Sequence, residues 1–224
     1  PYKPLEDFEY LGMINDVPMT LLGAPKLPAN TYRDFEAYIR ANNGKLNLAH
    51  AGLGSASHLC GLMWQSAVKL DKSMTTIAYR GTGPAMNDLI GGQVDVMCDQ
   101  TTNTVPQIEG GRVKAFAVTT AKPLSSHKLL KDYPSLQDMG VKGFNLTIWH
   151  GLNAPKGTPA DVTKRLNDAL KVALKDPEFI KRQEELGALV VTDNRLTPAG
   201  HKSFVASEIT KLKTVIDAAG QFAD

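Results

Sequence analysis

The chain has 224 residues, of which 42% are hydrophobic and 21% are charged. This composition is typical of folded globular proteins and excludes disordered and fibrous classes. Its 25 basic residues nearly balance 23 acidic ones, and no dense lysine or arginine run occurs, so the composition does not support a nucleic-acid or membrane-surface role. The sequence shows neither a targeting segment nor an apolar run long enough to span a membrane. A small-molecule role is favoured.

Strand and helix patterns alternate along the chain, which predicts an α/β fold with a mainly parallel sheet. The expected strands cover residues 9–13, 19–23, 46–51, 74–78, 94–100, 113–119 and 189–191. The expected helices cover residues 31–42, 55–70, 84–91, 105–109, 158–173, 176–187 and 197–219. Regularity fades between Lys122 and Asn153, and we interpret this segment as a crossing between domains.

The stretch from Leu46 to Leu62, LNLAHAGLGSASHLCGL, organises this pattern. A short buried strand leads into a glycine turn, and a helix then begins with hydroxyl side chains at its capping positions, Ser55 and Ser57. The first amides of a helix have no partner within it and carry partial positive charge, and glycine lets a ligand approach the backbone closely. This stretch therefore predicts a receptor for a carboxylate or a phosphate.

A second glycine turn, YRGTGP from Tyr79 to Pro84, repeats this architecture after the next strand. Pro84 fits the first helical position, and Gly91 with Gly92 fits the helix stop. The following strand carries Asp99 at its end. Because parallel sheets bind ligands at the carboxyl ends of their strands, we expect both turns and Asp99 at one edge.

The cysteines and histidines give no metal signal. Cys60 and Cys98 lack metal-ligand spacing and allow at most one bridge, and we expect free buried thiols. The remaining histidines outside the first glycine turn's helix show no metal-site spacing either; they are His50, His127, His150 and His201. No cofactor is expected.

Several linked motifs carry a resemblance to a known family. The runs AGLGSASHLCG, YRGTGPAMNDLIGGQVDVMCDQ, VKAFAVTTAKP and WHGLNAPKGTP occur in consistent order. With them, the chain from Pro4 to its end resembles the Bug, or TctC-like, periplasmic solute-binding proteins of tripartite tricarboxylate transporters. The resemblance implies a two-lobe, type II-like Venus flytrap fold. It also implies one complete lobe from 19 to 122 and a second lobe made of 1–18 and 123–224, incomplete because the family's leading segment is absent.

The family's function, carried over by resemblance, is non-catalytic capture of a small carboxylate-bearing solute and its delivery to a membrane transporter of the tripartite tricarboxylate type. The implied location is the periplasm, and self-association of this short chain is a further expectation. The implied ligand-binding residues are Gly54, Ser55, Ser57 and His58 in the first turn, Thr82, Gly83 and Ala85 in the second, and Asp99 and Trp149.

Each of these residues also has a purely structural interpretation. Ser55 and Ser57 can serve only as helix caps, His58 as a surface histidine, Asp99 as the cap of the next turn, and Trp149 as a core aromatic residue.

Other functional classes fit less well. A receptor that signals to a membrane sensor kinase is the main alternative. A dinucleotide-binding enzyme is less favoured because the glycine motif lacks its third glycine and no acidic residue clearly ends the next strand. No GK[ST] follows for a P-loop, and no G-x-S-x-G elbow supports a serine hydrolase.

Overall fold

The computed structural model describes residues 2–70 and 73–219, with side chains described for all of these except 215, 218 and 219. The chain forms two compact units. The small unit comprises residues 1–17 and 149–214, and the large unit comprises residues 18–148 and 215–224. The candidate site lies in the large unit, so each unit is described by itself.

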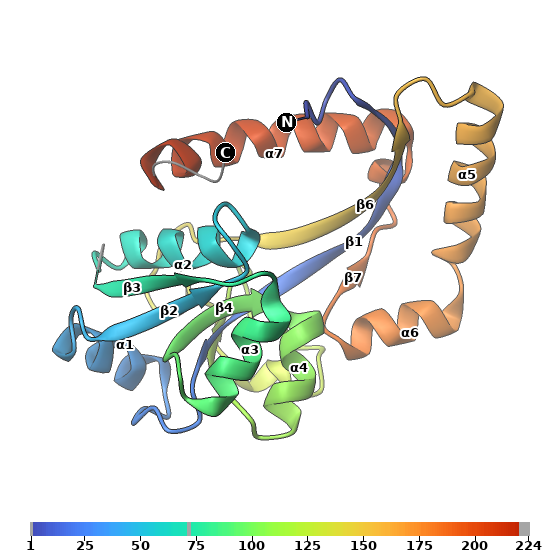
Figure 1. The fold of residues 1–224 in the computed structure, drawn as a ribbon. Coiled ribbons are helices and arrows are strands. Elements are labelled where there is room, and N and C mark those ends of the chain that lie inside the picture. The colour runs from blue at the N-terminus through green and yellow to red at the C-terminus, as the bar shows by residue number, and fades with distance from the viewer. Residues whose placement is uncertain (1, 71–72, 220–224) are drawn as a thin grey trace. The chain divides into compact units, whose positions relative to one another are not determined.

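Strands and helices alternate through most of the chain, as the apolar spacing predicts (Figure 1). The strands are β1 (Phe8–Gly23), β2 (Leu46–His50), β3 (Met74–Ala78), β4 (Val96–Gln100), β5 (Lys114–Val118), β6 (Thr147–Pro155) and β7 (Leu189–Val190). The helices are α1 (Tyr32–Ala41), α2 (Ala56–Ala67), α3 (Thr82–Gly91), α4 (Thr101–Glu109), α5 (Ala160–Ala173), α6 (Pro177–Glu185) and α7 (Pro198–Ala219), with short 3₁₀ turns η1 (Leu130–Asp132) and η2 (Asn194–Leu196).

The sheet of the large unit has the strand order β3-β2-β4-β1-β5. β2 pairs in parallel with both β3 and β4, whereas β1 is antiparallel to both β4 and β5. The prediction of a mainly parallel sheet is thus correct for β2, β3 and β4 and wrong for β1. The reason is that β1 runs in the opposite direction between two strands that share one direction, and the spacing of apolar residues does not encode strand direction.

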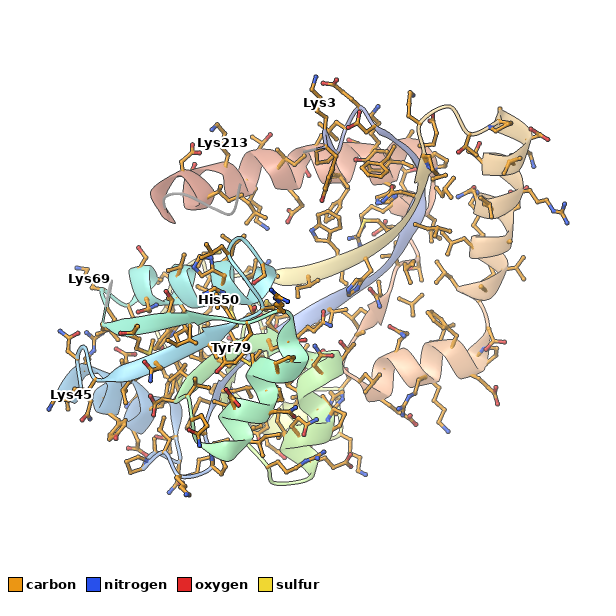
Figure 2. All side chains as sticks on the ribbon, in the orientation of Figure 1. Lys3, Lys45, His50, Lys69, Tyr79 and Lys213 are labelled. Atoms are coloured by element: carbon orange, nitrogen blue, oxygen red, sulfur yellow. A yellow bond between two sulfur atoms is a disulfide. The ribbon has the colours of Figure 1, made fainter. Side chains whose placement is uncertain are left out.

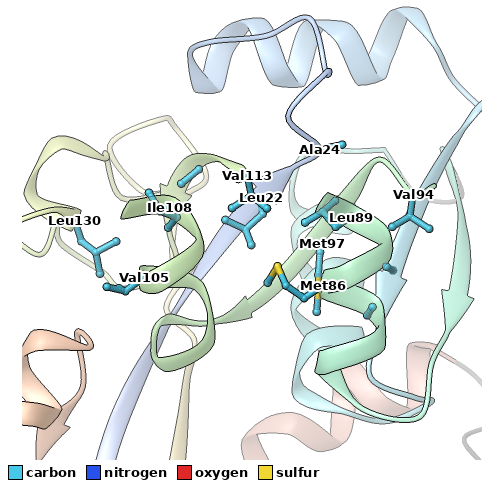
Figure 3. Close-up of a cluster of buried hydrophobic side chains, with 13 residues drawn as sticks. Leu22, Ala24, Met86, Leu89, Val94, Met97, Val105, Ile108, Val113 and Leu130 are labelled. Atoms are coloured by element: carbon cyan, nitrogen blue, oxygen red, sulfur yellow. The ribbon is translucent and has the colours of Figure 1, made fainter. Parts of the chain in front are cut away.

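Helices cover both faces of this sheet. α3 and α4 bury one face, where Met86 and Leu89 meet Leu22 of β1 and Met97 of β4 in a continuous apolar cluster (Figure 3). α1 and α2 cover the other face, where the ring of Phe35 lies 5.5 Å from that of Trp64 and 4.2 Å from that of Phe116. Successive strand residues point to opposite faces, so the parity of a residue decides which pair of helices it meets.

β1 is one continuous strand where two short strands, 9–13 and 19–23, were expected. Polar Asn15 and Asp16, followed by Pro18, resemble a break in the sequence. They lie where β1 changes partners: Asn15 and Asp16 pair with β7, and the pairing with β4 begins at Met19. A proline is tolerated at such a change because no ladder bond depends on its missing N–H group.

The large unit extends further along the chain than the lobe expected at 19–122. Its first boundary lies one residue from the expected position, but residues 123–148 belong to the large unit. Ser135 forms a bridge with Val118, Leu130 joins the apolar cluster of α3 and α4, and the hydroxyl of Thr119 donates to the carbonyl of Leu146 at 2.7 Å. These contacts hold residues 123–148 in the large unit, although their irregular sequence pattern resembles a crossing between domains.

In the small unit, α5 leaves large apolar side chains exposed. Val162 and Leu166 are exposed by 41% and 40%, while Asn167 and Leu174 are buried at 5% each. The Asn167 amide donates to the carbonyls of Leu11 and Leu196, so a polar side chain joins α5 to β1.

Candidate functional site

Two glycine turns lie together at the carboxyl edge of the sheet in the large unit. β2 and β3 are parallel, so His50 and Ala78 end at the same edge. The backbone amide of Tyr79 donates to the carbonyl of His50 at 2.9 Å, and the amide of Gly81 donates to the carbonyl of Ala51 at 3.2 Å. Figure 2 labels His50 and Tyr79 at this edge. The structure therefore brings the two predicted turns side by side.

The first turn satisfies many of its own polar groups. Ser55 caps α2 by accepting from the amide of His58 at 3.3 Å, and its hydroxyl donates to the carbonyl of Gly52 at 2.7 Å. The Ser57 oxygen accepts from the amide of Ala51 at 2.9 Å and lies 3.0 Å from the Ser55 oxygen. Because the Ser55 hydrogen is directed to Gly52, Ser57 is the donor in the serine pair. Both serine hydroxyls thus hold the turn.

Two histidines complete this turn. The rings of His50 and His58 stack with centroids 4.2 Å apart, and the Nδ1 atom of His58 accepts from the amide of Gly54 at 3.2 Å. Both rings are buried, at 0% and 5% exposure. Burial lowers the pKa of both imidazoles, and the neighbouring His50 lowers the pKa of His58 further. Among the predicted first-turn residues, His58 is therefore a neutral, buried part of the turn.

The second turn is built differently. α3 begins at Thr82, two residues before the expected Pro84, and its capping residue Gly81 supplies no side chain to the helix amides. Gly81 has φ of 99°, a left-handed conformation that favours glycine. Within the described part of the chain, the Thr82 oxygen accepts one hydrogen bond and its own hydrogen has no acceptor. The start of α3 therefore keeps unfilled donor capacity.

Asp99 joins the second turn through a residue that sequence reasoning missed. The Asn103 amide donates to Asp99 and to the Thr82 oxygen, each at 3.1 Å. Asp99 is 1% exposed, and burial raises the pKa of its carboxyl group to about 6, although hydrogen bonds from Gln100 and Asn103 act in the opposite direction. Near neutral pH, Asp99 changes its charge readily and can orient a hydroxyl group or a water molecule.

α4 begins immediately after this strand, at Thr101, where only a short helix from Val105 was expected. The residues before Val105 resemble a polar loop, but Thr101 and Thr104 are buried, and Thr104 bonds the Thr20 hydroxyl at 2.8 Å. Tertiary contacts thus outweigh local composition. Gln100, the capping residue of α4, makes no side-chain cap. α4 is a third helix start at the same edge.

A groove of about 310 Å³ runs between α3 and α4. Thr82, Gly83 and Asn103 lie among its lining residues, so it reaches the second turn and the partner of Asp99. The other lining residues are Met86, Asn87, Thr102, Pro106 and Gln107. The groove gives the second turn a concave surface lined by both polar and apolar groups.

Two further predicted site residues have other surroundings. The methyl group of Ala85 is fully buried in the apolar cluster beneath α3, so only its backbone is available at the turn. Trp149 belongs to the small unit, where its ring packs edge-on against Phe204 at 5.4 Å. Trp149 is half-buried and remains a predicted contact.

The two cysteines are joined, and the expectation of free thiols is wrong. Cys60 of α2 and Cys98 of β4 form a disulfide, with their Cα atoms 6.0 Å apart. Strand alternation places Cys98 on the face of the sheet that α2 covers, whereas Asp99 lies on the face that α3 and α4 cover. Cys60, the partner of Cys98, follows His58 by two residues in α2. The spacing of the two cysteines gave no hint of this three-dimensional contact.

In residues 2–70 and 73–219, no group of three or more histidine, cysteine, aspartate or glutamate side chains is arranged to hold a metal ion. Over the same part of the chain, no helix is long and apolar enough to cross a membrane.

The chain is similar to known proteins over nearly its whole length. The family model for the tripartite tricarboxylate transporter family receptor matches residues 1–221. A curated Agrobacterium vitis relative, the UPF0065 protein in the TAR-I ttuE-ttuC' intergenic region, is 43% identical over 98% of this chain. The chain spans 62% of that relative's length.

Solved structures give the same result. The periplasmic binding protein BugD has a TM-score of 0.92 and 43% identity, with 100% of this chain and 73% of that chain covered. MatC from Rhodopseudomonas palustris with bound malate has a TM-score of 0.88 and 34% identity over 96% of this chain and 71% of that chain. The R. palustris protein Rpa4515 with adipate has a TM-score of 0.89 and 28% identity over 98% and 71%. The mixed α/β fold is thus that of periplasmic binding proteins, and the chain belongs to the tripartite tricarboxylate transporter receptor family.

Proposed function

We propose that this chain takes part in the non-catalytic capture of a small carboxylate-bearing solute at the edge formed by the starts of α2 and α3. The observation that carries the proposal is the pair of adjacent glycine turns, joined by backbone bonds from Tyr79 and Gly81, with α3 left without a side-chain cap. First-turn amides and the helix dipole favour a negative charge at such a place. A carboxylate gains these interactions without displacing a side chain from α3.

Similar proteins support this ligand class. MatC is described with malate and Rpa4515 with adipate, both of which are dicarboxylates. In this chain, Thr82 and Gly83 offer donors to one carboxylate, while Asp99 offers an acceptor to a hydroxyl group or a bound water molecule. Gly54, Ser55, Ser57 and His58 shape the neighbouring turn, and Trp149 is the proposed contact from the small unit.

We further propose that the complete protein works in the periplasm and delivers its solute to a membrane transporter of the tripartite tricarboxylate type. The family match supports this assignment. The disulfide between Cys60 and Cys98 also supports it, because disulfides persist in oxidising compartments such as the bacterial periplasm. Deletion of the cognate transporter gene is expected to abolish solute uptake. For a sensory receptor, uptake would instead stay normal in the transporter deletion, and gene induction by the solute would be lost on deletion of the cognate sensor kinase gene.

A thermal-shift screen tests the capture step. Malate, adipate, an aromatic acid and an amino acid are compared with the uncharged diamides of the two diacids. At least one carboxylate is expected to raise the melting temperature in a concentration-dependent way, and the diamides are expected to have no effect. Recovery of the bound acid in altered chemical form would contradict non-catalytic capture. Equal shifts from acids and diamides would contradict anion recognition.

A further inference from the structure

Two histidines form an unusual buried pair beside the first glycine turn. His50 ends β2 and His58 lies in the first turn of α2, so a strand and a helix each contribute one imidazole. Their rings lie 4.2 Å apart with planes inclined by 31°. The sequence predicts His58 as a solute contact or a surface histidine, and it assigns no role to His50.

Each ring holds one amide of the glycine turn. The Gly52 amide donates to the Nδ1 atom of His50 at 3.3 Å, and the Gly54 amide donates to the Nδ1 atom of His58 at 3.2 Å. Gly52 and Gly54 have φ of 122° and 74°, so the turn depends on conformations that other residues rarely adopt. A ring nitrogen that accepts a hydrogen bond carries no proton, and a neutral imidazole then carries its proton on Nε2.

The surroundings of the Nε2 atom of His50 indicate that Nδ1 is the ring atom with a structural role. The Nε2 atom is buried and has no hydrogen-bond partner in residues 2–70 and 73–219. A buried donor without a partner is unfavourable, so packing alone gives no reason for an imidazole rather than an apolar ring at this position. The bond to Gly52 is the contribution that the imidazole makes and that an apolar ring lacks.

We propose that His50 is a positioning residue for the anion site and that, with His58, it holds the glycine turn as a stacked pair of neutral Nε2–H tautomers. This inference rests on the proposed function, because the turn positions the start of α2 for a solute. Protonation at either Nδ1 atom would replace an acceptor by a donor facing an amide and would release that side of the turn.

Burial is the main cause that lowers the pKa of both rings. The neighbouring His50 lowers the pKa of His58 further. The His50 ring therefore opposes protonation of His58.

Nitrogen NMR of the histidine rings in the 224-residue chain tests the inference without a ligand. At pH 7.5, both rings are expected to carry their proton on Nε2, and the Gly52 and Gly54 amides are expected to be protected from exchange. In His50→Phe, which keeps an aromatic ring but has no acceptor, protection of Gly52 is expected to fall at least about tenfold. His50→Asn, whose side-chain oxygen can replace Nδ1, is the matched control and is expected to retain more protection.

A pH titration adds a readout that ring packing alone would not change. The midpoint of His58 is expected below 6.5 in the native chain and closer to 6.5 in His50→Phe, because the opposing charge is gone. A proton on Nδ1 of His50, or unchanged Gly52 protection and an unchanged His58 midpoint in His50→Phe, would overturn the inference. The spectrum of the native chain tests the position of the ring protons even if a variant does not fold.

Malate titration links the pair to binding. His50→Phe is expected to bind malate about three- to tenfold more weakly than the native chain, and His50→Asn is expected to lie between them. If the native chain binds no malate while the ring and exchange results are as expected, the proposed ligand is wrong and the positioning role stands. If His50→Phe binds malate as tightly as the native chain does, His50 does not position the anion site.

Discussion

The starts of α2 and α3 follow the same sequence logic, a strand, a glycine turn and a helix, but they differ in how their polar groups are satisfied. At α2, Ser55 caps the helix and the serines and histidines bond within the turn. At α3, Gly81 provides no cap, and Thr82 keeps an unused hydroxyl hydrogen within the described residues. A glycine turn alone therefore does not reveal whether a helix start is available to a solute. Its capping side chains decide this.

Removing the disulfide is the largest expected perturbation of the α2 side. Cys60 and Cys98 are separated by 38 residues, and a crosslink of this span stabilises the fold by about 4 kcal/mol in the chain-entropy account. The Cys60→Ala, Cys98→Ala double variant is expected to lose about 2 to 4 kcal/mol in denaturant unfolding. Reducing agent should destabilise the native chain and leave the double variant unchanged. An equal effect on both proteins would contradict this prediction.

Replacing Asp99 tests the α3 side. The rise of its pKa from 3.8 to about 6 means that the folded state binds the proton more tightly, so ionisation of Asp99 costs stability above pH 6. Asp99→Asn is expected to raise the free energy of unfolding by about 1 to 3 kcal/mol at pH 7.5, and the gain should shrink as the pH falls towards 4. Urea unfolding at several pH values measures it.

Asp95→Asn is the matched control for this prediction. Asp95 lies just before β4 in the sequence and is half-buried. Its carboxylate accepts a hydrogen bond from the amide of Asn47 at 2.8 Å. Its replacement removes a charge that is hydrogen-bonded by the backbone, so no gain in stability is expected. A gain for Asp95→Asn equal to that for Asp99→Asn would indicate a general charge effect and not the burial of Asp99.

Ser55→Ala separates capping from solute binding at α2. Loss of the cap is expected to lower the free energy of unfolding by about 0.5 to 2 kcal/mol. Thr31→Ala removes the equivalent cap of α1, which accepts from Asp34 at 3.2 Å, and should have a similar cost. If the first turn positions the site, malate affinity falls in Ser55→Ala and not in Thr31→Ala. Equal affinity in the two variants would leave Ser55 as a cap only.

Of these variants, Gly83→Ala is expected to change the free energy of unfolding least. Its main expected effect is on malate affinity. Gly83 lies inside α3, no atom lies within 4 Å of an added Cβ, and alanine favours a helix over glycine by up to about 1 kcal/mol. The unfolding free energy should therefore stay constant or rise slightly. The added methyl group stands beside Thr82 in the groove, so malate binding should weaken. Unchanged binding would place the solute elsewhere.

The sequence was sufficient for local structure near the site. The alternation of strands and helices, the glycine end of α3 and both glycine turns follow from local residue patterns, and the structure confirms them. These features depend on backbone geometry within a few residues, which capping and glycine preferences encode directly.

Features that depend on distant partners were beyond sequence reasoning. The antiparallel direction of β1, the early start of α4 and the disulfide each require contacts between segments far apart in the chain. His50 and Asn103 were missed as site residues for the same reason, since strand parity and helix phase alone do not reveal which side chains meet. The resemblance supplied the ligand class, and the structure supplied the internal partners of the predicted residues.

The most direct test of the central claim is an amide NMR titration of the 224-residue chain with malate. The account predicts saturable shifts concentrated at Thr82 and Gly83, with smaller shifts at the start of α2, because the first amides of α3 receive no side-chain cap. The diamide of malate should produce none of these shifts. Saturable shifts confined to residues away from both helix starts, or equal shifts from malate and its diamide, would contradict the account.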